Sequence, residues 1–164
     1  MSLTLGLAYD EHGALAASGR ADSEIVARVL QDDYFLRSAP KSLDRNNFSY
    51  ILALVADLNE ADAAATLTAI IVACLAAALE HMPARPAQMW ITGGGRKNRE
   101  LMRLLQEALP MQVCDVDDMG FDGDMVEAQA FAYLAVRRAR GLPTSFPSTT
   151  GVGLPLSGGR LSPA

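Results

Sequence analysis

Three consecutive glycines, Gly93, Gly94 and Gly95, are the residues whose type and spacing most clearly suit chemistry. A short apolar run typical of a strand, residues 89–91, precedes them, and apolar residues at helical spacing follow from Leu101. Because glycine has no side chain, this turn can adopt positive φ and a flat ligand can approach its backbone. The following helix would add unpaired N–H groups at its N-terminus. This strand, glycine turn and helix suit a nucleotide.

The same glycines would also suit a tight turn that binds nothing. Their spacing matches neither the GxGxxG pattern of dinucleotide-binding folds nor the GxxxxGK[ST] pattern of phosphate loops. The glycines alone therefore leave both interpretations open.

Acidic residues follow the second expected strand, residues 111–116. A helix between two strands favours a parallel pair with a right-handed crossover, and ligands gather at the carboxyl ends of such strands. Asp115, Asp117 and Asp118 fall at that edge. They could form a metal cluster, but no other hard ligands accompany them at fixed spacing, so we interpret them as solvated loop acids.

Glu127 lies in the first turn of a helix expected to begin at Asp124 or Met125 and to end near residue 140. Its carboxylate would either stabilise the helix dipole or accept a hydrogen bond from a hydroxylated ligand. Two cations, Lys41 and Arg45, stand in a segment rich in loop-forming residues. That segment is either a solvated connection or a contact for a phosphate or carboxylate.

The elements that must position these groups are mainly helices. Besides the helix at Glu127, we expect helices over residues 22–32, 47–57, 60–81 and 98–109. Residues 6–20 are expected to form a loop with up to one helical turn around 14–17, and residues 144–164 a loop with one short strand near 152–156. The residues expected to face the core include Val29, Phe48, Ile51, Leu52 and Val55, with Phe131, Tyr133 and Leu134 at the core or its rim. The sequence therefore predicts a helix-rich α/β fold with a short, mainly parallel sheet.

Composition narrows the class of protein. The 164 residues suit one domain, half are hydrophobic, and a net charge of −5 with no basic stripe argues against nucleic-acid binding. The two cysteines, Cys74 and Cys114, are interpreted as buried thiols of a cytosolic protein. The two histidines, His12 and His81, are too few to make a zinc site expected. Residues 63–79 are apolar but alanine-rich, which favours a core helix over a membrane span. No signal peptide is expected, and residues 1–3 are interpreted as a cloning remnant.

Four segments, taken in order and at their separations, resemble the anhydro-N-acetylmuramic acid kinase family, within the sugar kinase, actin and Hsp70 superfamily. They are Pro40-Lys41-Ser42 with Arg45 and Phe48; Thr92-Gly93-Gly94-Gly95 with Asn98; Gly123-Asp124-Met125-Val126-Glu127-Ala128 with residues 130–135; and Gly141-Leu142-Pro143 with Pro147-Ser148-Thr149-Thr150-Gly151. The third and fourth are the more specific. The resemblance covers the chain from about Tyr9 onward and fits the C-terminal half of the family.

The resemblance implies a cytoplasmic bacterial enzyme of peptidoglycan recycling. Such an enzyme uses ATP and Mg²⁺ to convert 1,6-anhydro-N-acetylmuramic acid to N-acetylmuramic acid 6-phosphate, with two ribonuclease-H-like (actin/hexokinase-type) lobes and often a homodimer. Residues 4–164 would form part of the adenosine-side lobe. By resemblance, Gly93, Gly94, Gly95 and Asn98 would contact the adenosine and Glu127 the amino sugar, while Lys41 and Arg45 would lie near the cleft.

Two family motifs do not occur in this sequence, namely the phosphate loop and the Asp-Thr-Gly-Pro-Gly-Asn motif that carries the catalytic base. Phosphoryl transfer depends on positioning and electrostatics, so we expect no catalytic residue in this chain and no activity from it alone. An incomplete lobe would expose apolar surface, which predicts self-association. The alternatives are a noncatalytic nucleotide-binding or regulatory module and a different acetyl-sugar kinase of the same superfamily.

Overall fold

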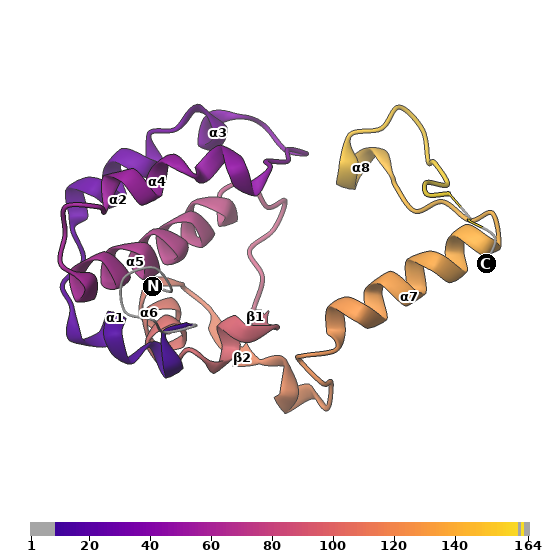
Figure 1. The fold of residues 1–164 in the computed structure, drawn as a ribbon. Coiled ribbons are helices and arrows are strands. Elements are labelled where there is room, and N and C mark those ends of the chain that lie inside the picture. Colours follow the sequence, from indigo (N-terminus) through magenta and orange to yellow (C-terminus); the bar gives the residue numbers. More distant parts are fainter. Residues whose placement is uncertain (1–8, 161, 163–164) are drawn as a thin grey trace.

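Helix α5 (Glu60–Leu79) runs through the middle of a helical body in the computed structural model, which describes residues 9–160 and 162 (Figure 1). An arm built from α7 (Val126–Ala139) and α8 (Pro147–Thr150) extends from that body. The remaining elements are η1 (Glu11–Gly13), α1 (Ala14–Ser18), α2 (Ser23–Leu30), α3 (Asp33–Leu36), η2 (Arg45–Phe48), α4 (Tyr50–Leu54), β1 (Gln88–Ile91), η3 (Gly94–Lys97), α6 (Arg99–Ala108), β2 (Gln112–Asp115) and η4 (Val116–Met119).

Local signals in the sequence explain where α5 begins. The Asn59 side chain accepts a hydrogen bond from the Asp62 N–H at 3.0 Å, and Glu60 and Asp62 lie in the first turn, where the helix dipole favours negative charge. Within the described part of the chain, α5 is the helix long and apolar enough, by length and composition, to cross a membrane. Here it packs against α1, α2 and α6, as the core-helix interpretation predicted.

Two hydrophobic clusters lie against α5. One joins α5 to α6 and the sheet through Val72, Leu79, Leu101, Leu105, Leu109 and Met111. The other joins α5 to α2 and α4 through Val29, Ile51 and Ile70, with Phe35 and Phe48 packed beside them. The expected core positions Val29, Ile51 and Val55 are confirmed as buried. The expectation for Leu52 was wrong, because α4 is a single short helix that leaves this side chain 65% exposed.

Strands β1 and β2 form a parallel pair, as the sequence predicted, with Gln88 opposite Gln112 and Ile91 opposite Asp115. Helix α6 connects them. The carboxyl ends of both strands therefore meet at one edge, from which the glycine turn and the loop before α7 emerge. Cys114 is buried on β2, and Cys74 is a half-buried free thiol on α5.

The arm departs most from the sequence-based prediction. Phe131, Tyr133 and Leu134 were expected at the core or its rim, yet they are 65%, 60% and 38% exposed, and α7 contains no buried residue. The prediction was wrong because, within the described chain, the helix extends away from the body (Figure 1), and the neighbour of the Tyr133 ring is the Arg137 guanidinium of the same helix. The tail also differs, since it forms the short helix α8 and a single antiparallel bridge between Ser145 and Leu156 rather than a strand.

Candidate functional site

The glycine turn presents open backbone at the end of β1. Gly93 has φ 69° and ψ −165°, a conformation that side-chain-bearing residues rarely adopt, and η3 follows at once. A Cβ atom added at Gly93 or Gly94 would meet no other atom within 4 Å, whereas one at Gly95 would contact Leu101 at 3.6 Å. Gly93 and Gly94 therefore face open space, and a flat group can approach them.

Asn98, the fourth residue expected at the nucleotide site, caps α6. Its Oδ1 accepts a hydrogen bond from the Leu101 N–H at 2.9 Å. Gly13, at φ 75°, packs so closely against the Asn98 side chain that a Cβ there would overlap it. The amide oxygen of Asn98 is thus used in capping α6, and the side-chain NH₂ group is the part that could bind a ligand.

Two direct hydrogen bonds join the glycine turn to the loop before α7. The Gly93 N–H donates to the carbonyl oxygen of Gly123 at 2.9 Å, and the Thr92 hydroxyl donates to the same oxygen at 2.9 Å. The segments Thr92 to Asn98 and Gly123 to Ala128, about thirty residues apart in the sequence, are therefore neighbours in space.

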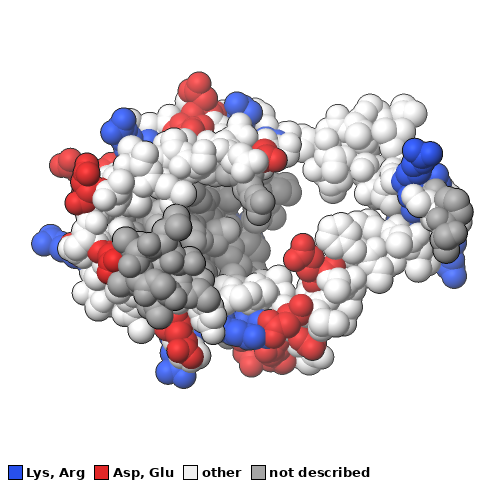
Figure 2. Space-filling view, in the orientation of Figure 1, with Lys and Arg blue, Asp and Glu red and all other residues white. Residues whose placement is uncertain are grey.

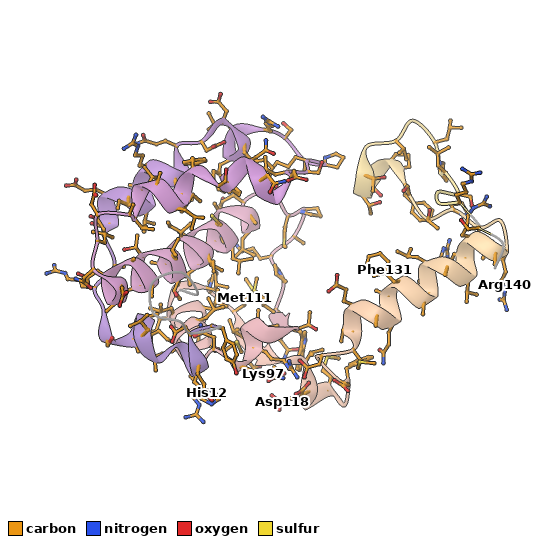
Figure 3. The ribbon with its side chains drawn as sticks, in the orientation of Figure 1. His12, Lys97, Met111, Asp118, Phe131 and Arg140 are labelled. Atoms are coloured by element: carbon orange, nitrogen blue, oxygen red, sulfur yellow. The ribbon has the colours of Figure 1, made fainter. Side chains whose placement is uncertain are left out.

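Arg96 strengthens this junction. Its side chain is 4% exposed, and its guanidinium pairs with three carboxylates: Asp124 at 2.7 Å, Asp117 at 3.2 Å and Asp115 at 3.4 Å. It also donates to the carbonyl oxygen of Gly93 at 2.9 Å. Lys97 adds a bond to Asp124 at 2.6 Å. Figure 3 labels Lys97 and Asp118 at the end of the body from which the chain continues to α7.

The contacts of this junction change the ionisation of its acids. The Gly123 N–H donates to Asp117 and, together with Arg96, holds the pKa of that carboxyl below its usual range. Hydrogen bonds from Arg96 and then Lys97 lower the pKa of Asp124 far below its usual range. Both acids therefore stay negatively charged under ordinary conditions, and the hydrogen bonds that Arg96 donates to Asp124 and Asp117 raise the pKa of the guanidinium.

Gly123 has a physical reason to be glycine. A Cβ at this position would overlap the Arg96 guanidinium, because the arginine passes directly against the backbone. The glycine of the Gly123 to Ala128 segment thus makes room for the ion-pair cluster.

Glu127 lies one residue into α7, in its first turn, and is exposed. Among the described residues its carboxylate has no hydrogen bond or ion pair. Its helix starts at the junction with the glycine turn, so the carboxylate and the turn belong to the same region of the molecule. The structure thereby joins the glycine turn to Gly123, which precedes Glu127 by four residues.

A second pair of family-like segments also meets in space. Residues Pro40, Lys41, Ser42, Thr149 and Thr150 line a cavity of about 210 Å³ where the end of the arm returns to the loop after α3. The Lys41 ammonium donates to the carbonyl oxygens of Tyr34 and Phe35 at 3.0 and 3.3 Å and lies 3.0 Å from His81 Nε2. The ammonium therefore has two backbone carbonyl acceptors, with the His81 ring beside them, which favours a structural role for Lys41.

Sequence reasoning missed Arg96. It treated Asp115 and Asp117 as solvated acids, whereas both are ion-paired with this arginine. The available signal was a basic residue directly after the glycines, matched by several acids after the next strand. Within the described part of the chain, no group of three or more His, Cys, Asp or Glu residues is arranged to hold a metal ion.

Comparison with known proteins identifies the family of the chain. The family model of anhydro-N-acetylmuramic acid kinase matches residues 2–164. An anhydro-N-acetylmuramic acid kinase of Roseobacter denitrificans is 55% identical over 158 residues, which cover 96% of this chain and 42% of the relative. Its counterpart in Cereibacter sphaeroides is 53% identical over 162 residues, covering 99% and 44%.

A third relative, the anhydro-N-acetylmuramic acid kinase of a Ruegeria species, is 51% identical, and again 96% of this chain matches 42% of the relative. The chain thus spans about two-fifths of the length of the curated relatives it matches. The match nevertheless includes the glycine turn, the junction and the arm, and the chain belongs to the anhydro-N-acetylmuramic acid kinase family.

Proposed function

We propose that this chain is the C-terminal, adenosine-side part of a kinase that uses ATP to phosphorylate 1,6-anhydro-N-acetylmuramic acid at O6. In that reaction water opens the anhydro bridge and the product is N-acetylmuramic acid 6-phosphate. The observation that carries the proposal is the open glycine turn joined directly to the start of the Glu127 helix. Family membership supplies the reaction.

The residues of the junction divide between two ligands in this proposal. Gly93 and Gly94 leave space for the adenosine against bare backbone, and Gly95 and Asn98 hold the turn in shape. The Asn98 NH₂ group faces the same ligand. Glu127, without a protein partner among the described residues, accepts a hydrogen bond from a sugar hydroxyl.

Catalysis needs groups that this chain does not supply in the proposed arrangement. The base that activates water and the loop that holds the phosphates would belong to the other part of the enzyme. Mg²⁺ would arrive with the ATP phosphates, because the described residues offer no metal-binding group. We expect a cytoplasmic enzyme that acts as a homodimer, and no turnover from this chain alone.

Nucleotide binding is the first part of the proposal to test. Replacing Gly94 with valine adds a side chain that meets no protein atom near Cβ, so the fold should tolerate it while the adenosine is blocked. We expect ATP affinity, measured by isothermal titration calorimetry, to fall by about tenfold or more, which corresponds to about 1.4 kcal/mol.

Gly153→Val is the matched control, because Gly153 also faces open space but lies in the tail. It should leave ATP affinity unchanged. Equal affinity in the Gly94 variant, or no ATP binding by the unaltered chain at millimolar concentration, would contradict a nucleotide site at this turn.

A further inference from the structure

The arm leaves the body at a small region, and its far end meets the body again where Thr149 and Thr150 face the loop at Pro40. Helix α7 contains no buried residue, and it leaves the body directly after the loop of residues 117–125 (Figure 1). Charged side chains of both signs gather at this point, while the visible face of α7 beyond it is mostly uncharged (Figure 2). Among the described residues, Arg96 is the charged residue that is buried, and it lies at this junction.

We propose that Arg96 is a positioning residue that fixes the start of α7, and with it Glu127, relative to the glycine turn. The importance of this for catalysis rests on the proposed function. The positioning itself rests on contacts within the chain.

Arg96 contacts three separate segments at once. It bonds to Gly93 in its own turn, to Asp115 and Asp117 at the end of β2, and to Asp124 just before α7. Because a guanidinium is planar and its donors point in fixed directions, satisfying all these acceptors sets their relative placement. A lysine ammonium could neutralise charge here but could not span the same acceptors.

Removing the guanidinium would leave two carboxylates of the junction without their shared cation. Asp117 and Asp124 would remain close together without the cation between them, and like charges repel. The direct links between the turn and the loop would then be the hydrogen bonds from the Gly93 N–H and the Thr92 hydroxyl to Gly123 and the ion pair of Lys97 with Asp124. Because no residue of α7 is buried and, within the described chain, the arm meets the body again only beyond the helix, near Pro40, a change of angle at Asp124 would move Glu127, which lies three residues further along.

Amide hydrogen exchange of the whole chain, followed by mass spectrometry, tests this proposal without any ligand. In Arg96→Gln we expect exchange in residues 92–98 and 120–128 to become faster by about tenfold or more, while exchange in α5 stays unchanged. Lys97→Gln is the matched control, since Lys97 is exposed and contacts Asp124 alone among these acids. It should leave the glycine turn protected.

Three results would overturn the proposal. If exchange in both segments of Arg96→Gln is unchanged, Arg96 does not fix the position of either segment. If exchange also becomes faster throughout α5, Arg96 has a general structural role instead. Full recovery of protection in Arg96→Lys would show that charge suffices and that the guanidinium geometry has no part. This test is independent of the ATP titration. If exchange becomes faster in both segments of Arg96→Gln while Gly94→Val binds ATP with unchanged affinity, the nucleotide site is refuted and the positioning role of Arg96 is supported.

Discussion

Two leucines show how strongly the contribution of a residue to stability depends on its burial. Leu105 on α6 is fully buried in the cluster between α5, α6 and the sheet, and Leu52 on α4 is 65% exposed. Both occupy helical positions that sequence periodicity marks as apolar. Truncating the two side chains should therefore change the free energy of unfolding by clearly different amounts.

We expect Leu105→Ala to lower the free energy of unfolding by about 2–5 kcal/mol, because it removes buried methyl groups and leaves a cavity. Leu52→Ala should change it by about 0.5 kcal/mol or less, as is usual for exposed positions. Urea denaturation of both variants measures the difference. Similar losses in the two variants would mean that α4 packs more deeply than the structure shows.

At the scale of elements, the junction between the glycine turn and α7 should respond to pH. The folded structure lowers the pKa values of Asp117 and Asp124, so these groups contribute stability above their unfolded pKa of about 3.9 and lose it as the pH falls through the folded values. We therefore expect amide exchange at residues 120–128, corrected for its intrinsic pH dependence, to become faster below about pH 4.

Asp124→Asn is the variant for this experiment. It should already exchange quickly in this segment at neutral pH and should show a weaker dependence on acid, because one of the two titrating groups is gone. A variant with the same pH profile as the unaltered chain would show that Asp124 does not control the junction.

At the scale of the whole molecule, the exposed apolar residues of α7 predict association. Phe131 and Tyr133 are well exposed on a helix that extends from the body, as Figure 3 shows for Phe131, and isolated chains with such surface tend to bind one another. The chain also spans only about two-fifths of its relatives' length, so partners for this surface could belong to the remainder.

We expect this chain to self-associate at micromolar concentrations and the double variant Phe131→Asp, Tyr133→Asp to sediment as a monomer in analytical ultracentrifugation. Leu36→Asp is the control, because Leu36 is also highly exposed but lies on α3 in the body. It should leave association unchanged. The prediction is contradicted if the unaltered chain sediments as a monomer over the whole concentration range.

Local signals in the sequence determined much of this protein. Apolar spacing located the principal helices, whose first turns the structure caps with Asp22, Asn59 and Asn98, and the helix between two apolar runs predicted a parallel pair of strands. These features depend on residues a few positions apart, which is why a sequence can reveal them. The glycine turn was visible for the same reason.

Tertiary structure alone decided which distant residues meet. Arg96 became the centre of the junction because folding placed Asp115, Asp117 and Asp124 around one guanidinium, and no local pattern encodes that arrangement. The sequence placed Phe131 and Tyr133 at the core or its rim, although burial requires a partner surface that helical spacing cannot supply. The sequence determined its helices and turn through neighbours along the chain, and three-dimensional packing determined which of their faces are covered.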